Sequence, residues 1–412
     1  MSRRRVFITG LGMVTPHGSD PHHVFSRVYA GESAVRDVEL DEPVSGVPDS
    51  VPLAPAHLDG KGIISKAQRI FMARASELAV VAAHGALGTA GLLEDGLGPG
   101  EAGVYVGCGL GGSEALQKAY RTHYLKGRRV RPTTVPLTMA NGPTSHISMQ
   151  YALRGPTVSY SIACASSAVA LGEAFRAIRD GYQDVIVSGG TEAMLNGVTV
   201  SAWHLLGVLA RPHPEGVETS SRPFDAQRTG IVLGEGAVMF VLESEERVQR
   251  RGVVPLGEIV GYGMGSDAHN LTDPHKDGQI QAFTAALRDA RLDPEAIGYI
   301  NAHATATPIG DLVEIEAIKE AFGDHAENLP ISSTKAVHGH LVGAAGAIEA
   351  AITCMALDKR MIPPTAHLTD PDPALDLDCV PCIGRAVDDL EYGLSNSFAF
   401  GGTNAALIFR RV

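Results

Sequence analysis

The sequence is poor in aromatic residues, which make up 5% of its 412 positions and include a single tryptophan. No apolar run reaches the roughly 20 residues that a membrane-spanning helix needs, which excludes a protein built on such helices. An excess of basic charge is also absent, because the formal net charge is −12. Non-specific binding to nucleic acid or to an anionic membrane is therefore not expected.

Cysteine is scarce as well. The five cysteines are odd in number and scattered along the chain, unlike the disulfide framework of a small secreted protein. We therefore expect a reducing, cytoplasmic location. The N-terminus, MSRRRVFITG, lacks an apolar segment followed by a cleavage site, and we expect it to form the first strand rather than a signal peptide. We interpret the C-x-x-C spacing of Cys379 and Cys382 as chance, because no second pair of zinc ligands is nearby.

Glycine, in contrast, is abundant at 47 residues, which indicates tight turns and close backbone contacts. Short apolar runs that end near glycine alternate with segments of helical periodicity, a pattern typical of α/β folds with mainly parallel sheets. The expected strands are 6–9, 103–107, 157–162, 184–188, 231–242 (a strand or hairpin), 260–265, 297–301, 394–400 and 405–409. The expected helices are 65–84, one that begins at Cys164, 280–291, 311–322 and 341–357.

This series of strands and helices restarts near residue 255, which predicts an internal duplication. A chain of this length also suits two core-forming halves better than one. We place the halves at residues 1–252 and 253–412.

The segment S-I-A-C-A-S-S places Cys164 where an expected strand ends and an expected helix begins. Unpaired backbone N–H groups and the helix dipole favour negative charge there, so we expect a lowered thiol pKa and a nucleophilic sulfur. The same N–H groups could hold an oxyanion, and the small neighbours leave room for a substrate. The alternative is a buried, inert cysteine.

Two of the 16 histidines follow strands in unusual turns. His303 lies in N-A-H-A-T-A-T-P and His340 in S-T-K-A-V-H-G-H. Both positions are strand-to-helix junctions, where α/β folds place ligand-binding groups. The alternative is that each histidine caps a turn. Asp311 and Glu314 open the following helix, where acidic side chains interact favourably with the dipole.

Together with the closing motif N-S-F-A-F-G-G-T-N, these segments resemble the elongating β-ketoacyl-(acyl-carrier-protein) synthases of type II systems, essentially from end to end. The resemblance implies the α/β thiolase fold, a duplicated αβαβα architecture of five layers with the site between its halves, and a dimer. It implies that Cys164 carries the acyl group, and that His303 and His340 stabilise the enolate left when a malonyl thioester loses CO2. Backbone N–H groups of Cys164 and Phe400 would form the oxyanion hole.

The resemblance also implies further site residues. Lys335 would support the site electrostatically with Glu314 and Asp311, Thr305 and Thr307 would hold the pantetheine arm, and Phe400, Ala399 and Asp267 would form a gate. A monovalent cation site seen in some members would use Asn301, Glu349, Ser395 and Asn396. No free cofactor is implied, because decarboxylation itself generates the carbanion and the substrates are carried on the phosphopantetheine of acyl carrier protein.

Some residues depart from the family pattern. Ala304 and Ala399 stand where members usually have glycine, and alanine does not readily adopt positive φ. Leu110, Thr133 and Thr134 would line the acyl pocket, and the two threonines are smaller than the usual phenylalanines. We therefore expect an unusual acyl chain: longer, unsaturated or aryl-capped.

A basic segment and one basic helix start offer a docking surface for an acidic carrier protein. We define the basic patch as Lys66, Arg69, Lys126, Arg128 and Arg129. The alternative is an ordinary solvated charge run. The pathway stays open between fatty-acid and type II polyketide or polyene synthesis, as does the choice between a homodimer and a heterodimer with a chain-length-factor-like subunit. A non-catalytic acyl-binding subunit is the competing function. A degradative thiolase is disfavoured because the C-terminal motif has no second cysteine.

Overall fold

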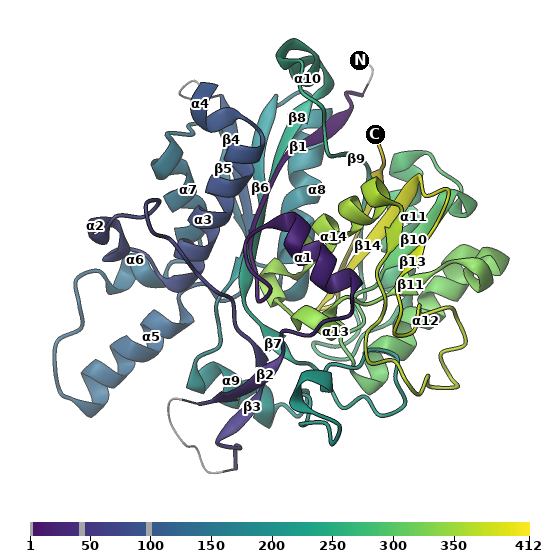
Figure 1. Ribbon diagram of the computed structural model, residues 1–412. Coiled ribbons are helices and arrows are strands. Elements are labelled where there is room, and N and C mark those ends of the chain that lie inside the picture. The colour runs from purple at the N-terminus through teal and green to yellow at the C-terminus, as the bar shows by residue number, and fades with distance from the viewer. Residues whose placement is uncertain (1–2, 41–45, 96–100) are drawn as a thin grey trace.

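The computed structural model describes residues 3–40, 46–95 and 101–412. Its centre is a ten-stranded sheet that consists of two five-stranded halves (Figure 1). The first half has the spatial order β5-β4-β6-β8-β1, and the second has the order β11-β10-β14-β15-β9. The strands of the first half are β1 (Val6–Val14), β4 (Ala102–Gly107), β5 (Thr157–Tyr160), β6 (Val185–Glu192) and β8 (Gly236–Ser244). Those of the second are β9 (Gly257–Ser266), β10 (Ile297–Asn301), β11 (Ile331–Ser332), β14 (Tyr392–Ala399) and β15 (Thr403–Arg410).

The two halves repeat one topology. If the five strands of each half are numbered 1 to 5 along the chain, they lie side by side in the order 3-2-4-5-1 in both halves. The halves join where Val6–Ile8 pair with Gly257–Ile259. The predicted duplication is therefore present, whereas the division at 252/253 stays a prediction. The expectation of mainly parallel sheets was wrong, because each half combines two parallel and two antiparallel pairings.

Helices cover both faces of each half and complete five layers (Figure 1). Helix α3 (Arg74–Thr89) covers the outer face of the first half, and α11 (Lys276–Ala290) with α12 (Pro308–Phe322) covers that of the second. Helices α8 (Ser166–Arg179) and α14 (Ala345–Lys359) pack against each other in the middle layer. Gly12 and Gly263 make the equivalent outer contacts: a Cβ would lie 2.2 Å from the oxygen of Ala82 or 2.1 Å from that of Ala282.

Shorter elements surround this framework. The helices are α1 (Pro21–Tyr29), α2 (Lys66–Arg69), α4 (Leu92–Asp95), α5 (Ser113–Tyr120), α6 (Thr134–Thr138), α7 (Gly142–Tyr151), α9 (Gly197–Leu205), α10 (Glu245–Arg251) and α13 (Lys335–His338). The small sheets contain β2 (Arg36–Glu39), β3 (Ser50–Ala54) and β7 (Leu233–Gly234), and β12 (Met361–Ile362) with β13 (Arg385–Ala386). Within the described ranges, no helix is both long and apolar enough to span a bilayer.

Two expected elements were wrong in detail. The helix expected at 65–84 is divided into α2 and α3, because Ala73 has an extended backbone and forms the N-cap of α3. The strand expected at 231–242 is divided at Glu235, whose buried carboxylate binds the Arg74 guanidinium and the Ala56 N–H. The two parts, β7 and β8, belong to different sheets.

Candidate active site

A tight turn between β5 and α8 positions Cys164. Ala163 has φ of 41°, in the left-handed region, and Cys164 lies in a 3-10 turn, Ala163–Ala165, just before α8. The Ser166 hydroxyl holds this turn, because it accepts from the Ile162 N–H at 2.8 Å and donates to the Ala163 carbonyl at 2.7 Å. The cysteine therefore precedes the helix instead of opening it, and the turn holds its thiol in a fixed place.

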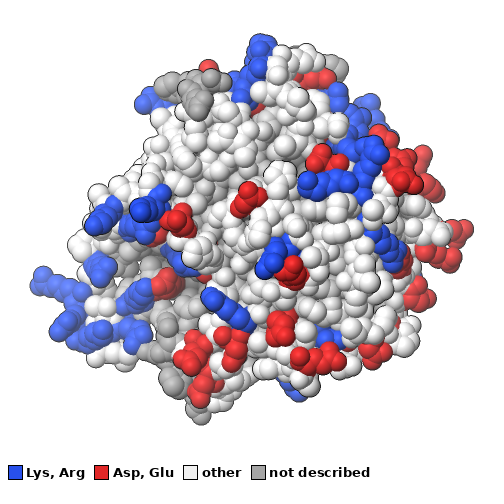
Figure 2. Space-filling model, viewed as in Figure 1, with Lys and Arg blue, Asp and Glu red and all other residues white. Residues whose placement is uncertain are grey.

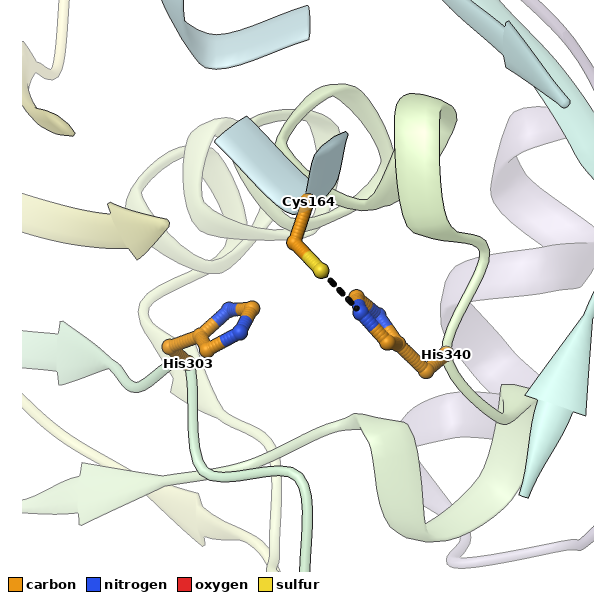
Figure 3. A group of neighbouring side chains, drawn as sticks. All are labelled: Cys164, His303 and His340. Atoms are coloured by element: carbon orange, nitrogen blue, oxygen red, sulfur yellow. Dashed lines mark hydrogen bonds between the residues drawn. The ribbon is translucent and has the colours of Figure 1, made fainter. Parts of the chain in front are cut away.

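The two histidines converge on this thiol from the second half of the chain (Figure 3). Nε2 of His340 lies 2.9 Å from Sγ of Cys164. The rings of His303 and His340 are 5.3 Å apart at an interplanar angle of 83°. One ligand atom from each of the three residues lies within 4.8 Å of the others, a cluster that could also coordinate a thiophilic metal such as Zn²⁺.

Burial changes the protonation of the cysteine. It raises the pKa of the Cys164 thiol to about 12, against the opposing effects of the Lys335 charge and the Phe400 N–H, which lower it. The expectation of a lowered thiol pKa was therefore wrong, because desolvation of a thiolate outweighs the favourable charges around it. At neutral pH the thiol carries its proton and needs an acceptor for it, and Nε2 of His340 is within reach.

Both histidines are neutral at physiological pH. Burial lowers the pKa of His303 and of His340 well below the ordinary value, and the nearby Lys335 charge lowers both further. A neutral imidazole can donate one hydrogen bond and accept another. Two neutral rings that face one cavity can therefore stabilise a developing oxyanion without a strong base nearby.

Glu314 fixes the loop that carries His303. Its carboxylate accepts from the backbone N–H groups of His303 at 2.8 Å and Ala304 at 2.7 Å, and from the Asn396 amide at 2.9 Å. Asp311 binds the Phe224 N–H at 2.9 Å, and burial raises the pKa of Asp311 to about 7. Both carboxyl groups therefore hold loops in place and do not contact the thiol.

Lys335 is fully buried, and its ion-pair partner is Glu349 rather than Glu314. Its ammonium group also lies 3.4 Å from the Ala302 carbonyl. Beside this pair, Asn301 on β10 is in register with Ser395 on β14. Side-chain oxygens of Asn301 and Asn396 are buried without a hydrogen-bond partner within the described part of the chain. Unpaired oxygens of this kind fit a hard monovalent cation.

A cavity of about 340 Å³ leads from Cys164 and both histidines to the surface. Thr305 and Thr307 line it, and their hydroxyls are 3.3 Å apart. Thr307 also caps α12 by accepting from the Gly310 N–H. The buried Cys164 and the exposed Ile309 line the same cavity, so a ligand that enters from the surface can reach the sulfur.

Two family models match most of the chain. The model described as Beta-ketoacyl synthase, N-terminal domain, matches residues 3–247, and Beta-ketoacyl synthase, C-terminal domain, matches residues 256–369. The chain belongs to the β-ketoacyl synthase family.

Individual relatives agree with this assignment. The 3-oxoacyl-(acyl-carrier-protein) synthase 2 of Vibrio cholerae is 37% identical over 416 residues and covers 100% of both chains. Nodulation protein E of a Rhizobium species (strain N33) is 40% identical over 413 residues, 99% of this chain and 100% of its own. The predicted family and activity are confirmed: the chain is a β-ketoacyl-acyl-carrier-protein synthase, an acyltransferase.

Solved structures share the fold over the whole length. A type II polyketide ketosynthase in complex with its acyl-carrier protein has a TM-score of 0.92 at 26% identity, with 100% of both chains covered. The ishigamide ketosynthase and chain length factor has a TM-score of 0.92 at 30% identity, again with 100% of both chains covered. The predicted α/β thiolase fold is therefore confirmed.

The residues that we predicted to form a gate lie on two segments that are joined by hydrogen bonds. The Phe400 ring stacks on Trp203 at 5.6 Å. Asp267 donates its backbone N–H to the Gly402 carbonyl at 2.8 Å and accepts from the Asn404 amide at 2.6 Å. Ala399 and Ala304 are absent from the residues with positive φ, so alanine fits both positions without backbone strain.

The acyl-pocket residues that we predicted do not line the cavity of the single chain. Leu110 is 53% exposed, and Thr133 and Thr134 are half-buried near α6. The reasoning from sequence also missed Glu192, whose buried carboxylate accepts from backbone N–H groups of the Leu110 turn and from that of Gly343. It also missed Trp203, which stacks on Phe400, although the single tryptophan of the chain could have marked this position as unusual.

The basic patch lies at one end of the molecule, over α2 and the segment that follows α5 (Figure 2). Its five residues are all exposed. Arg69 and Lys126, which are far apart in sequence, line one recess of about 760 Å³ together with Arg131. Packing thus combines the two basic segments into a single surface.

Proposed function

We propose that Cys164 is the acylated nucleophile of this synthase. The observation that carries the proposal is the 2.9 Å approach of His340 Nε2 to Cys164 Sγ at the inner end of the cavity. His340 accepts the thiol proton as sulfur attacks the acyl thioester. The new acyl–sulfur bond forms as the old one breaks, and the proton passes to the departing pantetheine thiolate. Because the thiol pKa is raised, proton transfer and attack are coupled.

His303 and His340 act in the second half of the reaction. Once the acyl group has replaced the thiol proton, the proton of each neutral ring can occupy the nitrogen that faces the cavity. Both rings then donate hydrogen bonds to the carbonyl oxygen of the malonyl thioester as it loses CO2. The electron pair of the broken C–C bond forms an enolate, whose carbon attacks the acyl carbonyl on Cys164. The new C–C bond forms as the acyl–sulfur bond breaks, and the released Cys164 thiolate regains its proton from solvent. The Phe400 N–H, which lies against the Cys164 sulfur, and the Cys164 N–H form the oxyanion hole for this step. Lys335 supports both steps through its charge.

Mass spectrometry after incubation with acyl-carrier protein loaded with an acyl group tests this function. The expected result is one acyl adduct, on Cys164. A matched control is Cys382→Ser, which removes the exposed cysteine and should leave the adduct unchanged. A non-catalytic acyl-binding subunit, the competing function, would carry no covalent adduct, and that outcome would refute the proposal.

The same cavity also suggests residues that bind the pantetheine arm and residues that form a gate. Thr305 and Thr307 hold the pantetheine arm inside the cavity. Phe400 and Ala399 move with the Asp267 loop, because backbone and side-chain hydrogen bonds join the two segments. A monovalent cation held by oxygens of Asn301, Ser395, Asn396 and Glu349 would neutralise buried oxygens beside Lys335.

A dimer would complete the acyl pocket. β5 forms one edge of the ten-stranded sheet, and exposed edges favour pairing with a second chain. Large apolar side chains of the first half are exposed, including Tyr124 at 75%, Val135 at 68% and Met149 at 67%, the last on α7, which contacts β5. A partner over this face would cover Leu110, Thr133 and Thr134. Native mass spectrometry distinguishes a homodimer from a heterodimer with a chain-length-factor-like subunit, and a monomer would refute this part.

The last part of the proposal concerns the acyl substrate and the protein that delivers it. We propose a longer, unsaturated or aryl-capped chain, in fatty-acid or type II polyketide synthesis in the cytoplasm, with delivery by acyl carrier protein at the basic patch. Profiling of the acyl chains that load Cys164 tests the substrate. A profile of ordinary saturated chains alone would contradict it.

A further inference from the structure

Gln279 is a polar residue with no role in the reaction described above, yet it lines the cavity that holds Cys164. It lies in the first two turns of α11 and is 1% exposed. Its side-chain oxygen is buried without a hydrogen-bond partner within the described part of the protein. A buried amide without a partner is destabilising unless a bound ligand supplies the missing hydrogen bond.

The position of Gln279 indicates which part of a ligand it would meet. Phe283 lies four residues further along α11, hence on the same helix face. The Phe283 ring contacts Phe398 at 5.8 Å, and Phe398 contacts His303 at 5.9 Å. Gln279, Phe398 and both histidines line the same cavity, and the 1% exposure of Gln279 places it in the buried part of that cavity, where the thioester end of an arm would lie.

We infer that Gln279 binds the secondary amide nearest the sulfur of the pantetheine arm. This inference rests on the proposed function, because it requires a pantetheine thioester in the cavity. A primary amide and a secondary amide are complementary, since each offers an N–H donor and a carbonyl acceptor. The contact would fix the thioester carbonyl in front of His303 and His340, so Gln279 would contribute to recognition of the arm rather than of the acyl chain.

Two malonyl thioesters of equal chain length separate this role from a structural one. The thioester of N-acetylcysteamine retains the sulfur-proximal amide, whereas the thioester of 1-pentanethiol replaces it with carbon. CO2 release by the acylated enzyme gives kcat/KM for each. Gln279→Met retains the side-chain length and removes both hydrogen-bonding groups. It should lower kcat/KM for the amide-bearing thioester about tenfold, or about 1.4 kcal/mol, and change that for the pentyl thioester less than about twofold.

Gln281→Ala, an exposed residue on the same helix, is the matched control and should behave like the wild type. Equal losses with both thioesters, or no loss with either, would overturn the inference. A second variant, Gln279→Ala, should give the same selective loss if Met alone disturbs packing. Acylation of Cys164, measured by mass spectrometry in the same samples, reports the proposed function separately, since its loss in the wild type would refute that function and not the role of Gln279 alone.

Discussion

The ammonium group of Lys335 is paired with the carboxylate of Glu349 in the protein core, where both side chains are almost fully buried. Neither residue touches the Cys164 sulfur, but the Lys335 charge lowers the pKa of Cys164, His303 and His340. The pair therefore tunes the protonation of the whole site through space.

Lys335→Met should slow the chemistry of Cys164. Without the positive charge the thiol pKa rises further, and alkylation of Cys164 by iodoacetamide at pH 8 should fall roughly tenfold, the effect of one pKa unit. The lone Glu349 should also cost about 3 kcal/mol of stability, measured by urea unfolding. Adding Glu349→Gln should recover stability but not reactivity. Lys359→Met, at the exposed end of α14, is the control. Unchanged alkylation in Lys335→Met would contradict the tuning.

Glu314→Gln should impair decarboxylation more than acylation. An amide has one acceptor oxygen in place of two and would place N–H donors against the N–H groups of His303 or Ala304. The His303 loop should shift, and small displacements at a reacting centre cost roughly 100-fold in rate. CO2 release should fall by about that factor, while Cys164 acylation changes by less than about threefold. Glu316→Gln, exposed on the same helix, should change neither rate. Equal losses of both rates would argue against a specific role in placing His303.

The family resemblance carried by the motifs predicted that Cys164, His303 and His340 meet, and the structure brings the three side chains together. The direction in which the pKa of Cys164 is shifted could not be predicted from the motifs. The local helix start favours a thiolate, but the burial that outweighs it comes from segments far apart in sequence. The ion-pair partner of Lys335 could not be predicted for the same reason. Nothing in the sequence distinguishes Glu314 from Glu349 as the carboxylate that pairs with this lysine.

The division of the helix expected at 65–84 had a different cause. No glycine or proline interrupts the segment, so helical periodicity alone predicts one element. The chain instead turns at Ala73, and Ile70 and Phe71 stay 58% and 49% exposed. The surroundings of the predicted acyl-pocket residues could not be predicted from the sequence either, because Leu110 lies at the surface of the single chain.

His338 should make stability depend on pH. Burial lowers the pKa of His338 to about 3, whereas an unfolded histidine titrates near 6.5. Between these values the unfolded chain binds about one more proton here, so this residue's contribution lowers stability as pH falls, by about 1.4 kcal/mol per pH unit. In His338→Gln, unfolding free energies measured between pH 6 and 5 should fall less steeply by that amount. Identical slopes in the two proteins would show that His338 is protonated in the folded state.

Reversal of charge in the basic patch should weaken the encounter with the carrier protein. Arg128→Glu combined with Arg129→Glu places two acidic groups where an acidic partner would approach. The recess lined by Arg69 and Lys126 is also lined by Val130 and Arg131, the next residues along the chain. The KM for carrier-bound malonate should rise about tenfold and the effect should shrink at high salt, because exposed charges are screened. The KM for malonyl N-acetylcysteamine should stay unchanged, since that thioester needs no docking surface. Arg250→Glu, exposed on α10 away from the patch, controls for net charge. An equal rise in KM for both thioesters would indicate damage to the cavity, and no rise for either would leave the patch an ordinary solvated surface.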